Sequence, residues 1–205
     1  MQDRTIGIVV FGDAEELDFV GPWEVFTMAK QAMAGSLEAQ DLGVVLVAET
    51  LAPVRCAKGL RVLPDYTFDD APELDIVLVP GGIGTRHEAD NTRLTDWLAK
   101  VAARCEWVTS VCTGALLLQR AGLVDGKRVT THWGYVETLR KDAPETTVLD
   151  SARYVRDGNV VTAAGVSAGI DMALWLTGQL WGPDHARTTQ RMMEYDPAPP
   201  YSAEV

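Results

Sequence analysis

The sequence has few cysteines, and they form no pattern. Its 205 residues include three, Cys56, Cys105 and Cys112, which is an odd number with no repeated spacing. This argues against a disulfide framework and favours free thiols in a reducing cytoplasm. Histidine is equally scarce, with three residues far apart in the sequence, and no C-x-x-C pair occurs. We therefore expect no metal site.

Basic residues are fewer than acidic residues. The chain has 18 lysines and arginines against 29 aspartates and glutamates, which gives a formal net charge of −11. An acidic surface repels nucleic acid and anionic membranes, so we expect neither as a partner. No apolar stretch approaches the ~20 residues of a membrane span, and the first residues lack the features of an export signal. These absences favour a cytoplasmic protein.

What the sequence does contain is a regular alternation of short β-branched runs and longer amphipathic stretches. Almost continuously apolar runs, typical of buried parallel strands, occupy residues 5–11, 42–49, 75–82, 106–111 and 159–165. Helical patterns lie at 21–34, 91–104, 113–122, 133–141, 167–181 and 184–194. The alternation predicts an α/β fold with a doubly wound, mostly parallel sheet and helices on both faces.

The remaining segments complete a single domain. Residues 53–70 and 146–158 are interpreted as hairpins or excursions, and no composition shift marks a domain boundary. We expect one domain over 1–194 and a proline-rich extended tail at 195–205. Asn91 or Thr92 is expected to cap the helix at 91–104, and Gly122 to close the helix at 113–122.

Cys112 lies between a strand pattern and a helix pattern, in the stretch TSVCTGALLL. No loop residues separate the two patterns, so Cys112 is expected on a sharp strand-to-helix turn. The sulfur would then face a helix N-terminus, where backbone N–H groups favour a thiolate. We interpret Cys112 as a nucleophile, and Cys56 and Cys105 as structural.

A second stretch, GVSAG at 165–169, matches the G-x-S-x-G pattern of serine hydrolases. A serine nucleophile needs a histidine base downstream, and His185 is the only one. Because His185 lies in a helical pattern, we favour a different role for Ser167. It is expected in a small-residue turn that caps the next helix and lines the pocket.

Three further positions follow predicted strands and could contribute to a site. Gly82 and Ile83, in PGGIGT, either aim backbone N–H groups at a developing negative charge or form an ordinary turn. Asp18, in EELDFVGPWEVF, is either a helix N-cap or a partly desolvated general acid or base. His132, in TTHWG, either pairs with Cys112 or caps and lines the cavity.

Taken together, these motifs resemble the ThiJ/PfpI superfamily. The resemblance covers nearly the whole chain, through LDFVGPWEVF, VLVPGGIGT, TSVCTGALLLQRAGLVDGKRVTTHW and GVSAGIDMAL in this order. It implies a flavodoxin-like, class I glutamine-amidotransferase-like fold with a cysteine on a nucleophile elbow. The branch that the chain most resembles is that of isonitrile hydratases, in which threonine follows the cysteine, as Thr113 does here. The protease-like members have histidine at that position.

The resemblance implies a cofactor-free addition of water to a small-molecule isonitrile, giving an N-substituted formamide. Cys112 would attack the terminal carbon, and Asp18 would protonate the substrate and then activate water. Thr113 would hold Asp18, the substrate or the water, with backbone N–H groups near Gly82 steadying the charge. A homodimer is expected from the resemblance, the six tryptophans and the apolar C-terminal third.

Two other functions remain open from the sequence. One is a glyoxalase-type or amidase-type reaction of the same thiolate. The other is a non-catalytic redox or small-molecule sensor, in which Cys112 is oxidised. The superfamily domain also forms the sensor half of AraC-type regulators, but this chain ends in a short tail where those carry a helix-turn-helix region.

Overall fold

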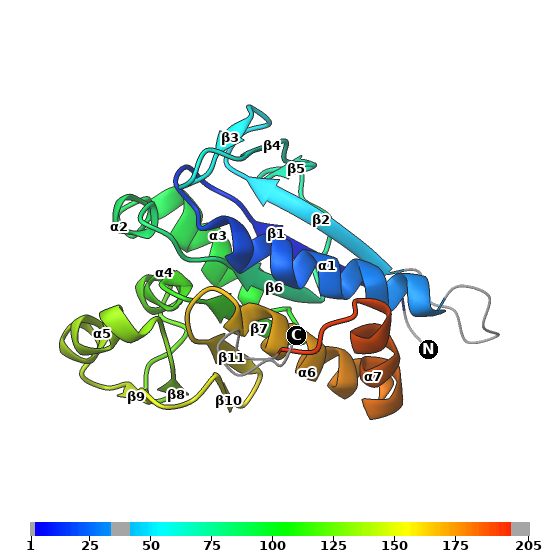
Figure 1. The fold of residues 1–205 in the computed structure, drawn as a ribbon. Coiled ribbons are helices and arrows are strands. Elements are labelled where there is room, and N and C mark those ends of the chain that lie inside the picture. Colours follow the sequence, from blue (N-terminus) through cyan, green and yellow to red (C-terminus); the bar gives the residue numbers. More distant parts are fainter. Residues whose placement is uncertain (1–2, 34–41, 198–205) are drawn as a thin grey trace.

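The computed structural model describes residues 3–33 and 42–197, which are built around one seven-stranded sheet (Figure 1). The strand order is β10-β11-β7-β6-β1-β2-β5. The bounds are β1 Arg4–Val9, β2 Leu42–Ala48, β5 Tyr66–Thr67, β6 Ile76–Val79, β7 Trp107–Val111, β10 Tyr154–Asp157 and β11 Val160–Ala163. All neighbouring strands are parallel except β10, which runs antiparallel to β11.

The centre of the sheet is apolar because both of its faces are covered. Every residue of β6, β7 and β11 is buried, and most of them are valine or isoleucine. Continuous burial of this kind is typical of parallel strands between two layers of helices. The five predicted strands are confirmed, together with the doubly wound sheet.

Helices lie on both faces of the sheet (Figure 1). On one face α1, α6 and α7 pack against one another, and on the other α3 and α4 are in contact. The helices have these bounds: α1 Glu16–Met33, α2 Thr85–Glu88, α3 Thr92–Ala102, α4 Gly114–Arg120, α5 Val136–Asp142 after the 3₁₀ turn η1 Trp133–Tyr135, α6 Ala168–Trp181 and α7 Pro183–Met192. None of the helices in the described ranges combines the length and apolar character needed to cross a bilayer.

The prediction for the first helix was wrong at its start. The helix begins at Glu16 rather than at residue 21, and Pro22 lies inside it. The Gly-Pro pair was interpreted as the helix start, since proline is best tolerated in the first turn. Asp18 is therefore inside the first turn of α1 and is not its N-cap. The last residue predicted for this helix, 34, lies outside the described residues.

Other local predictions are confirmed. The Asn91 side chain accepts hydrogen bonds from the backbone of Arg93 and Leu94 and caps α3. Gly122, with a φ of 71°, follows α4. Segment 53–70 contains the hairpin of β3 (Val54–Arg55) and β4 (Arg61–Val62).

The 146–158 segment is more varied than a hairpin. It contains β9 (Thr147–Val148), which pairs in parallel with β8 (Arg128–Val129), and then β10, which turns into β11. Of the predicted tail at 195–205, the structure describes only the first three residues, and 198–205 lie outside the described residues. The Tyr195 hydroxyl donates to Asp171 of α6 at 3.0 Å.

The sheet order determines where a site can form. The chain moves from β1 to β2 in one direction and from β6 through β7 to β11 in the other. The order therefore reverses between β1 and β6, and ligands bind at the carboxyl ends of strands beside such a reversal. The segments that leave β1, β6 and β7 at this edge contain Asp18, the glycines at 81–82 and Cys112.

Candidate active site

Cys112 lies on a strained turn between β7 and α4. Its φ is 57°, in the left-handed region that non-glycine residues rarely adopt. Surrounding hydrogen bonds hold this backbone: the Cys112 N–H lies 3.1 and 2.9 Å from the carbonyl oxygens of Ala163 and Ala164, and Thr131 Oγ1 donates to the Cys112 carbonyl at 2.7 Å. The predicted elbow is therefore present, and its conformation is fixed by β11 and by the segment after β8.

Two glycines allow neighbouring backbone to approach this elbow. A Cβ at Gly81 would lie 2.5 Å from the Thr113 nitrogen and 2.8 Å from the Cys112 Cβ. A Cβ at Gly114 would lie 2.2 Å from the carbonyl oxygen of Val79. Real side chains do not tolerate such distances, so glycine at these positions lets the turn after β6 pack directly on the elbow.

Asp18 is brought against Cys112 from the first turn of α1. The aspartate is fully buried, and its Oδ2 accepts the Gly81 N–H at 2.8 Å. Its other oxygen, Oδ1, has no hydrogen-bond partner among the described residues. The Cys112 thiol lies close enough to lower the pKa of the carboxyl through a hydrogen bond. One carboxyl oxygen is thus held by the backbone, and the other is buried without a hydrogen-bond partner among the described residues.

Burial makes Asp18 a proton acceptor that is half ionised near neutrality. Desolvation raises its pKa from 3.8 to about 7, against the lowering effect of the Gly81 N–H. The nearby Glu15 carboxylate raises it further, while Cys112 and Lys58 lower it. Lys58 is ion-paired with Glu15, and its backbone N–H donates to Glu16 at 2.7 Å. These groups place the turn between β3 and β4 against the start of α1.

The expectation of a resting thiolate at Cys112 was wrong. The side chain is buried, and desolvation together with the Asp18 charge raises the thiol pKa to about 12. Backbone N–H groups of Thr113 and Val166 and the Thr113 side chain act in the opposite direction. The helix N-terminus is therefore outweighed by burial and by a neighbouring carboxylate. The sulfur therefore carries its proton at neutral pH.

In the described part of the chain, Thr113 makes no hydrogen bond to Asp18. Its Oγ1 accepts the Gly82 N–H at 3.1 Å and donates to the Gly82 carbonyl oxygen at 3.1 Å. The Gly82 N–H, which was expected to face a ligand, is thus used inside the protein. The backbone N–H groups of Thr113 and Val166 are the ones that lower the pKa of the Cys112 thiol. Ile83, the next residue after Gly82, is 62% exposed.

His132 follows Thr131, whose hydroxyl donates to the Cys112 carbonyl oxygen. Its Nδ1 accepts the Gly134 N–H at 3.1 Å, and its ring packs on Gly165, where a Cβ would lie 2.4 Å from the ring. In the described part of the chain it makes no hydrogen bond to Cys112. Its role as a cap of the η1 turn is confirmed.

The GVSAG segment is not a second nucleophile elbow. The positive φ of 49° belongs to Val166, one residue before the serine. Ser167 is exposed at the start of α6, makes no side-chain cap hydrogen bond, and lies 3.4 Å from Arg153. His185, its only downstream partner in sequence, binds the Ala29 carbonyl at 3.0 Å. The expected capping bond of Ser167 is therefore absent.

The sequence did not reveal the residues that contribute only a backbone N–H group, or those whose side chains surround Thr113. Val166 and Gly81 contribute N–H groups, which no residue type reveals. Thr85 and Arg86, just after the glycine-rich turn, surround Thr113 with donors at 3.1 and 3.4 Å. The only feature of the sequence that pointed to Thr85 and Arg86 was their position directly after PGGIG.

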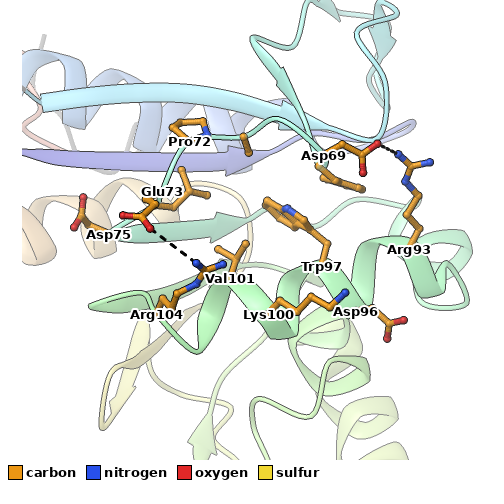
Figure 2. A pocket seen from close by; sticks show the side chains of 13 residues that line it. Asp69, Pro72, Glu73, Asp75, Arg93, Asp96, Trp97, Lys100, Val101 and Arg104 are labelled. Atoms are coloured by element: carbon orange, nitrogen blue, oxygen red, sulfur yellow. Dashed lines mark hydrogen bonds and ion pairs between the residues drawn. The ribbon is translucent and has the colours of Figure 1, made fainter.

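A cavity of about 730 Å³ lies away from this site, between segment 68–75 and α3 (Figure 2). Phe68 and Trp97 stack in it with ring centroids 4.6 Å apart. Two ion pairs, at 2.7 and 3.9 Å, connect its walls: Arg93 with Asp69 and Arg104 with Glu73. None of the predicted site residues lines it. Within the described ranges, no three His, Cys, Asp or Glu side chains form a group that could hold a metal ion.

Comparison with known proteins adds to this geometry. Residues 4–179 match the model of the DJ-1/PfpI family. The chain is 41% identical over 198 residues to isonitrile hydratase from Pseudomonas putida, covering 97% of this chain and 81% of that protein. A solved structure of a THiJ/PfpI family protein from Pseudomonas syringae superposes with a TM-score of 0.87 at 34% identity, covering 100% of this chain and 80% of that one.

A more distant similarity concerns part of a longer protein. The HTH-type transcriptional regulator GbdR from Pseudomonas aeruginosa is 31% identical over 143 residues. The match covers 70% of this chain but only 38% of the regulator.

Proposed function

The chain belongs to the DJ-1/PfpI family, and from this premise we propose that it is an isonitrile hydratase-like enzyme. The reaction is the addition of water to R–N≡C to give R–NH–CHO, without a cofactor. Cys112 is the nucleophile and Asp18 the acid and base. The identity to the Pseudomonas putida enzyme supports the substrate class. The observation that carries the proposal is the buried Asp18 carboxyl against Cys112, with one oxygen unpartnered in the described residues.

The first half of the reaction joins sulfur to the substrate. Asp18 takes the thiol proton as the Cys112 sulfur bonds to the terminal carbon, and then gives that proton to the same carbon. The product is a thioimidate, S–CH=N–R, which contains all atoms of the isonitrile and the thiol. A carboxyl with a pKa of about 7 suits both directions of this transfer. The N–H groups of Thr113 and Val166 stabilise charge on the sulfur.

The second half consumes water. Asp18 removes a proton from water as the oxygen adds to the thioimidate carbon, and it then gives this proton to the nitrogen. The C–S bond then breaks, the C=O bond forms, and the remaining hydroxyl proton returns to the sulfur. The products are the formamide and the original thiol–carboxylate pair, so atoms and charge balance.

Other residues bind the substrate in this proposal. Ile83 and His132 flank the turns on which Gly82 and Val166 lie, and Ile83 offers an exposed apolar surface for the R group. Ser167 lies one residue from Val166 and could contact the R group from α6. Gly82 contributes by holding Thr113 through its N–H.

We also propose a cytoplasmic homodimer. On α1, Leu17, Val20 and Trp23 are spaced three residues apart and are each more than a third exposed, a surface suited to a second copy. Light scattering at micromolar concentration should give twice the chain mass, and a monomer would contradict this part of the proposal.

Loss of the isocyanide infrared band together with formamide production tests the activity. Cys112→Ala and Asp18→Asn should each lower turnover by at least about 10³-fold, since each removes a group that makes or breaks bonds. Asp69→Asn, an exposed carboxylate in the distant cavity, is the matched control and should leave turnover unchanged. Full turnover in either site variant would refute the assigned roles.

Two other results would point to other functions. Lactate formed from methylglyoxal with isonitriles untouched would favour a glyoxalase-type enzyme. Absence of turnover, with rapid oxidation of Cys112 by mild peroxide, would favour a sensor. The raised thiol pKa argues against the sensor, because a protonated thiol reacts slowly with peroxide.

A further inference from the structure

Val166 has a backbone conformation that valine rarely adopts. Its φ is 49°, in the left-handed region, and it lies in the turn between β11 and α6. Valine is branched at Cβ, so a positive φ crowds its side chain against its own backbone, and such a residue persists only where its surroundings hold it. Cys112 on the elbow is strained in the same way, with a φ of 57°. The elbow and the turn after β11 are thus both strained, and the second needs a support of its own.

The turn after β11 is hydrogen-bonded to the Cys112 elbow. The Cys112 N–H lies 2.9 Å from the carbonyl oxygen of Ala164 and 3.1 Å from that of Ala163. Ala164 stands two residues before Val166, and its carbonyl belongs to the peptide that leads into the turn. The direction of this carbonyl therefore depends on the conformation of the turn. A change of φ at Val166 reaches the elbow through this hydrogen bond.

Arg153, directly before β10, contacts the turn on both sides. Its carbonyl oxygen accepts the Ala164 N–H at 2.9 Å, which extends the ladder between β10 and β11 by one residue. Its side chain reaches the far side of the turn, where Nη2 lies 3.4 Å from Ser167 Oγ. The guanidinium is also ion-paired with Asp171 in the first turn of α6, with Nε 2.8 Å from Oδ2. One residue thus connects the strand that enters the turn to the helix that leaves it.

Asp171, the anion of this pair, is itself held in place. Its Oδ1 accepts the Tyr195 hydroxyl at 3.0 Å, while Oδ2 binds the guanidinium of Arg153. The Asp171 side chain is 28% exposed, whereas that of Asp69, in the ion pair on α3, is 78% exposed. An ion pair that is partly shielded from water and held by a further hydrogen bond contributes more than an exposed one.

We propose that Arg153 is a positioning residue for Cys112: it brackets the strained Val166 turn and thereby keeps the Ala164 carbonyl against the Cys112 N–H. Without the bracket, Val166 relaxes toward a negative φ and the Ala164 carbonyl turns away from the elbow. Arg153 acts through the backbone of residues 164–167 and not on the reacting atoms. This role deepens the proposed function and rests on it, since it concerns the same nucleophile, but its first test needs no substrate.

Amide hydrogen exchange, followed residue by residue by NMR, tests the bracket. Arg153→Met should speed exchange at the Cys112 and Ala164 amides about tenfold relative to Leu78, since a charge-assisted hydrogen bond contributes free energy of this order. Leu78 is fully buried in the central strand β6 and reports opening of the whole sheet. Arg93→Met, which removes the exposed ion pair with Asp69, is the matched control and should leave these ratios unchanged.

A double-mutant cycle with Val166 separates the bracket from a general loss of stability. Glycine adopts a φ of 49° without strain, so the turn in Val166→Gly no longer needs the bracket. In this background Arg153→Met should have no further effect on exchange at Cys112. Asp171→Ala, which frees the guanidinium, should behave like Arg153→Met in both backgrounds and provides a second route if one variant folds poorly. Equal acceleration with valine and with glycine at 166, or no acceleration in either, would overturn the proposal.

Turnover distinguishes this proposal from the proposed function. Where Cys112 attacks an isonitrile, Arg153→Met should lower kcat about tenfold with KM unchanged, and adding Val166→Gly should restore most of the loss. A protein that hydrates no isonitrile but shows the predicted exchange cycle would refute the proposed function and keep the role of Arg153. A protein that hydrates isonitriles but shows an additive exchange cycle would do the reverse.

Discussion

At the scale of single residues, the site is a buried thiol next to a buried carboxyl. Burial raises the pKa of both groups, to about 7 for Asp18 and about 12 for Cys112. Since the Asp18 pKa lies far below that of the thiol, the last proton rests on sulfur. In the proposed reaction this proton moves to Asp18, so the ionisation state of Asp18 is expected to govern activity.

The pH dependence of kcat/KM follows from the ionisation of Asp18. The competent form has the thiol protonated and Asp18 ionised, and it is lost when Asp18 binds a proton. We expect kcat/KM for isonitrile hydration to rise with pH through an inflection near 7, measured between pH 5 and 9. A rate that falls with increasing pH over the same interval would show that protonated Asp18 is the form that starts the reaction.

The same burial predicts a stability change at Asp18. The pKa of Asp18 is higher in the folded protein than in the unfolded chain, so the folded protein binds this proton more tightly. The stabilisation from proton binding is complete below pH 3.8 and is lost as the pH rises to about 7. Above pH 7 the buried charge destabilises the fold by up to about 4 kcal/mol. Asp18→Asn should therefore raise the free energy of unfolding in urea at pH 8.5 and have little effect at pH 4. An equal effect at both pH values would contradict the shift.

At the scale of elements, the site depends on three segments that meet at one glycine. The elbow after β7, the turn after β6 and the start of α1 meet at Gly81, whose N–H holds Asp18 and whose missing Cβ admits the elbow. The sequence predicted the elbow from the abrupt change of pattern around Cys112. It misplaced the start of α1 because Gly21 and Pro22 suggest a helix start more strongly than Glu16 does.

A Gly81→Ala variant tests this packing. Its Cβ would lie 2.5 Å from backbone of the elbow, so the turn must shift. We expect a loss of about 1–3 kcal/mol in unfolding free energy and a loss of about 100-fold in turnover. Gly12→Ala is the matched control, because nothing lies within 4 Å of its Cβ and its φ is not positive. Comparable losses in both variants would contradict the close approach.

At the scale of the whole molecule, the sheet order brings together residues almost a hundred positions apart. Strand and helix alternation was enough to predict the sheet, and the carboxyl ends of its strands were enough to predict where Asp18 and Cys112 would lie. The pKa of the thiol was not predictable in this way, because it depends on burial and on a neighbouring charge rather than on the helix that follows. Arg86 was missed for a related reason: its partners, Gly82, Thr113 and Tyr135, meet only in the folded chain.

Intact-mass and peptide mass spectrometry after rapid acid quench during turnover tests the covalent step most directly. The thioimidate contains the whole isonitrile, so we expect a mass increase equal to the full R–N≡C mass on the peptide that carries Cys112. Turnover to formamide with no adduct, or with an adduct on another residue, would contradict it.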